Sequence, residues 1–152
     1  MQEALKEARM AFEEDEVPVG AVIVSDKKII ARAHNQVERL KDPTAHAEMI
    51  AITQGAATLG SKWLNGASIY VTIEPCSMCA GALVLSRIKN LYFGATDPKT
   101  GACGSVTNIV NHKKLNHRIK CIFSKFAVLM NSLYLYVVLK LLNFTFYDKR
   151  SV

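Results

Sequence analysis

The chain has 152 residues, of which 50% are hydrophobic and 21% are charged, and its formal net charge is +6. These proportions are typical of a globular protein and exclude a disordered chain. The length suits one domain with a buried core.

The chain begins with MQEALKEARMAFEEDE, which is charged and amphipathic and lacks the apolar core of a secretory signal. We therefore expect a cytoplasmic protein whose four cysteines stay reduced. In that compartment a Cys-x-x-Cys pair indicates metal or redox chemistry instead of a disulfide.

Charge is distributed unevenly along the sequence. Ten of the 13 acidic residues stand at or before Glu48, and none stands between Asp97 and Asp148. The basic residues of that acid-free stretch are Lys99, Lys113, Lys114, Arg118, Lys120, Lys125 and Lys140. A long stretch with only positive charges suits binding to a polyanion such as nucleic acid. A solvated basic face without a partner would have the same pattern.

Helices and strands alternate in the predicted order. A helix is expected over 3–14, with Leu5, Ala8 and Phe12 on one face, followed by strands over 17–25 and 29–35. A helix over 42–60 follows, for which Pro43 and Thr44 are possible starting residues.

The second half of the chain continues this alternation. A strand over 67–74 ends at Pro75, a helix follows over 76–87, a strand over 89–95 and a glycine-containing loop over 96–105. Apolar strands with helices between them predict an α/β fold, organised as a three-layer α/β/α domain.

Three residues form a candidate metal site. Cys76 and Cys79 stand three residues apart at the start of a predicted helix, which puts both sulfurs on one side of its first turn. A helix N-terminus also favours thiolate over thiol. With His46 they supply Cys2His ligation for one Zn²⁺ per chain, and the fourth position is left to water. Four other residues fit less well and are expected to have packing or surface roles: His34, Cys103, His112 and Cys121.

Glu48 stands two residues after His46, so on a helix the two side chains point in different directions. Two thiolates neutralise the charge of Zn²⁺, and a nearby carboxylate would help to take a proton from water and pass it to a substrate nitrogen and a leaving amine. The alternative is a first-turn Glu that only stabilises the helix dipole. The downstream cysteine pair favours the proton carrier.

Several segments carry a resemblance to a known family. HAE and PCSMC match the signature of zinc-dependent nucleoside and nucleobase deaminases. EVPVGAV, DPTAHAEM, IYVTIEPCSMCAGALVLSRI, FGATDPKTGACGS and LNHR resemble the bacterial tRNA-specific adenosine deaminases. The resemblance covers about residues 1–120. It implies a cytidine-deaminase-like fold, a three-layer α/β/α sandwich around a mostly five-stranded mixed sheet.

The resemblance also implies a reaction, the deamination of adenosine to inosine at the wobble position of tRNA by zinc-activated water. His46, Cys76 and Cys79 would hold the metal, and Glu48 would be the proton shuttle. The substrate-binding residues implied are Asn35 at the flipped nucleoside, the backbone of Ala47 at the base edge, Asp97 and Lys99 at neighbouring nucleotides, and His117 at the RNA backbone. The implied partners are an arginine tRNA and a second copy in a homodimer.

Other functions remain open at this point. The chain is also compatible with a deaminase of a free base or nucleoside, such as guanine or cytidine. A third class is a non-catalytic RNA-binding or zinc module, including an inactive product with a disrupted C-terminus. The basic half favours RNA over a small metabolite, and a module without catalysis has no need of Glu48.

Residues 121–152 depart from the family pattern. Between 126 and 147 Lys140 is the single charged residue. Three explanations are compatible with this tail: a shifted reading frame, a divergent last helix that packs on the sheet or at a dimer interface, or a membrane anchor. The anchor is least favoured, since Lys140 would cost roughly 1–3 kcal/mol in a bilayer. We expect the tail to be poorly packed.

Overall fold

A computed structural model of the protein describes residues 1–123. The predictions for the tail therefore lie outside the described residues, apart from its first three positions. The elements are α1 (Gln2–Glu13), β1 (Gly20–Ser25), β2 (Lys28–His34), α2 (Val37–Leu40), α3 (Ala47–Leu59), β3 (Ser68–Ile73), α4 (Ser77–Leu85), β4 (Asn90–Ala95) and β5 (Lys120–Phe123).

The strands form one mixed sheet in the order β2-β1-β3-β4-β5. β1 is antiparallel to both β2 and β3, whereas β3, β4 and β5 are parallel to one another. The expected five-stranded mixed sheet is thus confirmed. Parallel strands end at the same edge of a sheet, so the segments that follow β3 and β4 meet there.

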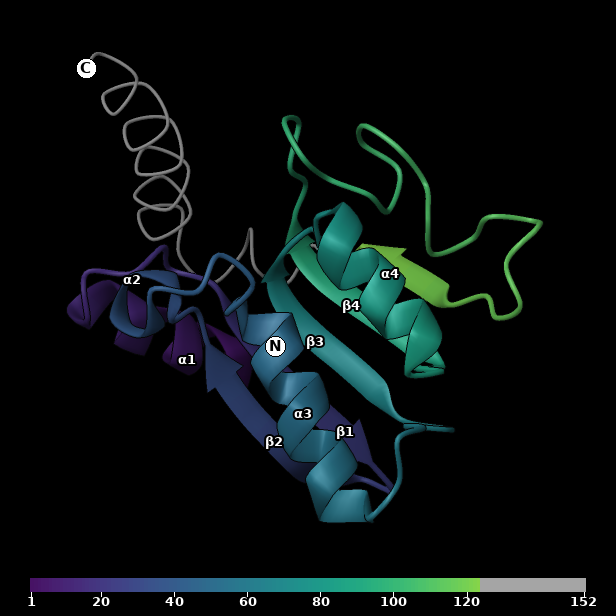
Figure 1. Ribbon diagram of the computed structural model, residues 1–152, viewed down its shortest axis with the longest axis horizontal. Helices are drawn as coiled ribbons and strands as arrows, with labels where there is room; N and C mark the ends of the chain where they lie inside the picture. The colour runs from purple at the N-terminus through teal and green to yellow at the C-terminus, as the bar shows by residue number, and fades with distance from the viewer. Residues whose placement is uncertain (124–152) are drawn as a thin grey trace.

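Helices lie on both faces of the sheet (Figure 1). α3 and α4 lie side by side on the near face, where Gly55 of α3 packs against Ile23 of β1 and Leu64. α1 lies on the far face, where it packs against Gly20 of β1. The predicted three-layer α/β/α arrangement is therefore confirmed in the described part of the chain.

The buried face of α1 differs from the prediction. Ala8 is buried as expected, but Phe12 is 47% exposed, and the buried positions include Ala4 and Ala11. A Cβ atom on Gly20 would lie 2.1 Å from the carbonyl oxygen of Ala4. The helix therefore approaches the sheet so closely that alanines, and no large apolar side chains, fit between them.

The predicted start of the helix over 42–60 was also wrong. The side chain of Asp42 accepts hydrogen bonds from the N–H group and the hydroxyl of Thr44, at 2.8 and 2.7 Å, and this forms a separate turn. The helix begins at Ala47, and His46 is its N-cap residue. Cys76 has the same position before α4, so both helices start at a candidate metal ligand.

The fold also bears on the membrane question. Among the helices of residues 1–123, none combines the length and the hydrophobicity that crossing a membrane requires.

Candidate metal centre and active site

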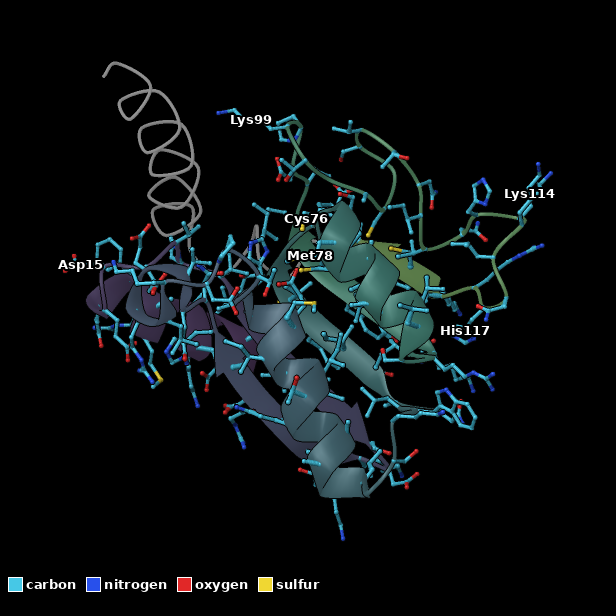
Figure 2. The ribbon with its side chains drawn as sticks, in the orientation of Figure 1. Asp15, Cys76, Met78, Lys99, Lys114 and His117 are labelled. Carbon is cyan, nitrogen blue, oxygen red and sulfur yellow. The ribbon has the colours of Figure 1, made fainter. Side chains whose placement is uncertain are left out.

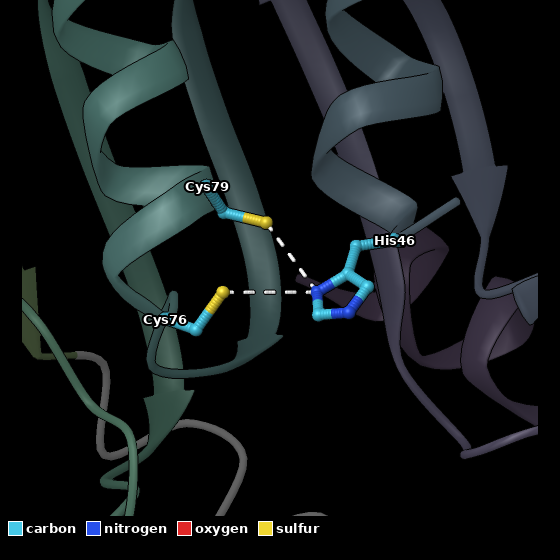
Figure 3. Close-up of side chains that lie close together, drawn as sticks. All are labelled: His46, Cys76 and Cys79. Carbon is cyan, nitrogen blue, oxygen red and sulfur yellow. Dashed lines mark hydrogen bonds between the residues drawn. The ribbon is translucent and has the colours of Figure 1, made fainter. Parts of the chain in front are cut away.

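The three predicted metal ligands converge between the N-termini of α3 and α4 (Figure 3). The Nδ1 atom of His46 lies 3.5 Å from the Sγ atom of Cys79 and 3.8 Å from that of Cys76. Tetrahedral zinc bonds of ~2.1 Å to nitrogen and ~2.3 Å to sulfur place such donor atoms about 3.6 Å apart. All three donor atoms lie within 4.8 Å of one another, so this group could hold a metal ion.

The two thiols differ in protonation. A hydrogen bond from Cys79, with a further one from His46, lowers the pKa of Cys76 to about 4. The hydrogen bond that it shares with Cys76 and its own burial raise the pKa of Cys79. The same contact with Cys76 raises the pKa of His46. The group therefore holds one thiolate, Cys76, next to a thiol, Cys79, that must lose its proton to bind a metal.

Glu48 lies beside this group, in the first turn of α3, and is 3% exposed. Burial raises the pKa of its carboxyl group, because the charged form loses hydration. Within the described residues, the three-donor metal group does not include Glu48. The structure thus brings together His46, Glu48, Cys76 and Cys79, with Glu48 in a position separate from the ligand set.

Two of the predicted substrate-binding residues lie next to this centre. Asn35 directly follows β2, is buried, and donates a hydrogen bond from its amide to Glu16 at 3.3 Å. The next residue, Gln36, donates its N–H to the carbonyl of Ala45 at 3.0 Å, which ties the end of β2 to the segment before His46. Ala47 is the first residue of α3, where backbone N–H groups have no acceptor inside the helix.

The loop after β4 lies at the same edge of the sheet, above the N-terminus of α4 (Figure 2). Gly101 in this loop forms a bridge with Cys76. The carboxylate of Asp97 accepts hydrogen bonds from the N–H of Lys99 at 2.8 Å and from the hydroxyl of Thr100 at 2.5 Å, so it caps its own turn. Figure 2 shows Lys99 at the outer end of this loop.

His117 is not brought to this centre. It lies at the far end of α4 (Figure 2), where its Nε2 donates to the carbonyl oxygen of Ile88 at 2.7 Å. A contact between His117 and RNA would therefore lie away from the metal group.

The residues that fit a metal site less well lie outside the three-donor group. His34 is buried between Glu7 and Glu14, as expected for a packing residue. Cys103 is also buried, and Cys121 lies on β5. His112 is exposed, and its Nδ1 accepts a hydrogen bond from the N–H of Lys114.

Sequence reasoning missed two buried carboxylates that support the site. Glu16 holds the amide of Asn35 and also accepts the N–H of Arg39 at 2.8 Å. Glu74, 2% exposed at the end of β3, accepts hydrogen bonds from the loop that contains Asp97. A Glu that ends an apolar strand, directly before Pro75 and Cys76, was the available signal for Glu74.

Comparisons with known proteins agree with this geometry. The family model described as MafB19-like deaminase matches residues 1–134. The tRNA-specific adenosine deaminase of Aquifex aeolicus (strain VF5) is 57% identical over 117 residues, which are 77% of this chain and 78% of that protein.

Two solved structures share the fold. One, from a study of A-to-I editing by tRNA:A34 deaminases at the wobble position of transfer RNA, has a TM-score of 0.81 and 44% identity, covering 84% of this chain and 93% of that chain. A guanine deaminase from Bacillus subtilis has a TM-score of 0.60 and 38% identity, covering 62% of this chain and 61% of that chain. With its cytidine-deaminase-like fold and its His-Cys-Cys group, the chain belongs to the tRNA-specific adenosine deaminase family.

Proposed function

We propose that the protein deaminates adenosine to inosine at the wobble position of tRNA. The observation that carries the proposal is the match to a tRNA:A34 deaminase structure, with a TM-score of 0.81, in a chain whose His46, Cys76 and Cys79 form a three-donor group beside buried Glu48. The 57% identity to a tRNA-specific adenosine deaminase, against 38% to a guanine deaminase, favours a nucleotide of RNA over a free base as the substrate.

The metal proposed is Zn²⁺, one ion per chain, held by His46, Cys76 and Cys79. The donor distances of 3.5 and 3.8 Å suit tetrahedral zinc, and three protein ligands leave one coordination position open. When bound, zinc would polarise a water molecule and make it a better nucleophile.

Glu48 is proposed to move the protons. Its carboxylate would accept a proton from water and donate it to a ring nitrogen of the adenine. It would then take the proton of the hydroxyl group added to the base and deliver it to the departing amine. Its burial suits this role, because burial raises the pKa of the carboxyl group and so favours its holding a proton more than an exposed Glu would.

The remaining residues would bind and orient the RNA. Asn35, held by Glu16, and the backbone N–H of Ala47 would contact the flipped nucleoside. Asp97 and Lys99 would contact neighbouring nucleotides, Asp97 chiefly by shaping the loop. His117 would meet the RNA backbone at the other end of α4.

The finer assignments belong to the same proposal. The substrate would be an arginine tRNA, recognised at its anticodon loop, and the protein would act as a cytoplasmic homodimer. Residues 1–120 would form the deaminase domain, with 121–152 as an atypical tail.

The test is inosine formation in an arginine anticodon stem-loop that carries a wobble adenosine. The unaltered protein should produce inosine and bind one zinc per chain. Glu48→Gln should bind the same zinc and lose at least about 10²-fold in rate, in line with the loss of a general acid–base. Exposed Glu38→Gln is the matched control and should retain activity.

Two results would count against this function. Inosine formation by the Glu48→Gln variant at the rate of the unaltered protein would show that Glu48 is not the proton shuttle. Deamination of free guanine or cytidine, with no reaction on the stem-loop, would assign the chain to the small-molecule deaminases instead.

A further inference from the structure

Glu74 is a buried charge that the proposed mechanism does not use. It follows β3 directly and is 2% exposed. A buried carboxylate is costly unless hydrogen bonds replace its lost hydration. The donors that satisfy it therefore indicate its role.

Within residues 1–123, all of its donors come from one loop, 97–105. Oε1 accepts the N–H of Cys103 at 2.8 Å and the N–H of Ser105 at 3.1 Å. Oε2 accepts the N–H of Asp97 at 3.1 Å and the hydroxyl of Ser105. Both ends of the loop are therefore tied to one carboxylate, through strong charge-assisted hydrogen bonds.

Gly101 allows the middle of the loop to close over this carboxylate. A Cβ atom there would lie 2.6 Å from the Cδ atom of Glu74 and 2.5 Å from the carbonyl oxygen of Asp97. The loop also contacts the turn that carries a metal ligand, because Gly101 forms a bridge with Cys76 and Ala102 donates its N–H to Pro75 at 2.9 Å.

We propose that Glu74 is a positioning residue for the RNA substrate, which holds the loop 97–105 at the rim of the metal centre without touching the reacting base. This inference rests on the proposed function and specifies one part of it. The loop carries Asp97 and Lys99, so its conformation decides how nucleotides next to the target are bound. The expected consequence is an effect on KM and not on kcat.

The first variant is Glu74→Gln, which keeps the side-chain shape but points an NH2 group at backbone donors. In the zinc-loaded protein, KM for the anticodon stem-loop should rise about 10-fold or more, because a displaced loop binds flanking nucleotides poorly. The value of kcat should stay within about threefold and zinc should remain bound, because the side chain does not contact reacting atoms. Exposed Glu13→Gln is the control.

The second variant changes a residue of the loop itself. Gly101→Ala places a methyl group against the Asp97 carbonyl and should raise KM in the same way. Gly81→Ala is its control, since a Cβ atom there meets nothing within 4 Å.

Amide hydrogen exchange reads the loop directly. Exchange at Asp97, or at Cys103 and Ser105, should accelerate at least about 10-fold in Glu74→Gln, because the NH2 group that replaces one carboxylate oxygen cannot accept their hydrogen bonds. Unchanged exchange would overturn the inference whether or not the protein is active. In an active protein, a loss of kcat at unchanged KM, or a loss of zinc, would also overturn it. Absence of inosine from the unaltered protein would instead contradict the proposed function.

Discussion

At the scale of single residues, the two cysteines of the metal group are chemically unequal. Cys76 is half-buried and accepts hydrogen bonds from Cys79 and His46, so the pKa of its thiol falls to about 4. Cys79 is buried and has a raised pKa. Metal binding must therefore remove a proton from Cys79, and the affinity for zinc should fall as the pH is lowered.

Alkylation by iodoacetamide tests this inequality in the metal-free protein. Cys76 stays a thiolate above about pH 4, so its reaction rate should change little between pH 7 and pH 5. An ordinary thiol of pKa ~8.5 would lose about 10-fold in rate per pH unit over that range. Mass spectrometry of the peptide distinguishes the sites. Modification of Cys79 before Cys76 would contradict the assignment, and zinc should protect both residues.

At the scale of elements, the site is built by two helix N-termini that meet at the end of β3. His46 and Cys76 are the N-cap residues of α3 and α4, and Glu48 and Cys79 lie in the first turns. The unpaired N–H groups and the helix dipoles favour negative charge at this point. A pair of thiolates and a carboxylate can therefore lie close together there.

Spacing along the chain was sufficient to predict that the two cysteines lie together. Cys76 and Cys79 are separated by less than one helical turn, so their proximity is a local property. His46 was paired with them only through the requirement of a metal for a third donor and through the family resemblance.

Long-range contacts explain what the sequence could not reveal. The buried face of α1 depends on Gly20, which is distant from Ala4 in the chain, and the close approach favours alanine over Phe12. The role of Glu74 depends on a loop that lies more than 20 residues later in the chain. The start of α3 differs from the prediction for a local reason, because Asp42 forms a separate turn with Thr44. No periodicity of apolar residues records such contacts.

Gly20→Ala tests the packing of α1 on the sheet. The added methyl group would lie 2.1 Å from the carbonyl oxygen of Ala4 and 2.5 Å from the backbone nitrogen of Ala8, so the whole helix must shift. We expect the free energy of unfolding to fall by about 3 kcal/mol. Urea denaturation measures it, with Gly81→Ala as the open-space control. Equal stability of the two variants would show that α1 does not pack as described.

At the scale of the whole molecule, two lysines lie at the end of the sheet opposite the metal group. The metal group follows the carboxyl end of β3. At the other end of the strands, Lys89 directly precedes β4 and Lys120 is the first residue of β5, and the N–H of Lys120 donates to the carbonyl of Lys89 at 3.0 Å. Strands of this length separate the two edges by about 20 Å. An RNA that uses both edges must extend beyond the target loop.

Salt dependence tests whether the distal edge binds RNA. Exchanging both Lys89 and Lys120 for Ser should weaken stem-loop binding and reduce the slope of log K against log[salt] by up to about 2, because each phosphate contact contributes ~0.7–0.9. Fluorescence anisotropy at several salt concentrations measures it. The control exchanges Lys6 and Arg9, exposed on α1, for Ser. An equal loss of slope in both variants would mean that the effect is one of net charge alone.

Trp63 lies at this distal edge, 40% exposed, with the Lys62 ammonium 4.8 Å and the Arg87 guanidinium 4.3 Å from its ring centroid. It is the single tryptophan of the chain. Its emission therefore originates from one known place, far from the metal centre, and is sensitive to the two cations that flank the ring. The protein thus carries a built-in optical probe, which separates RNA arrival at this edge from occupation of the metal centre without any label.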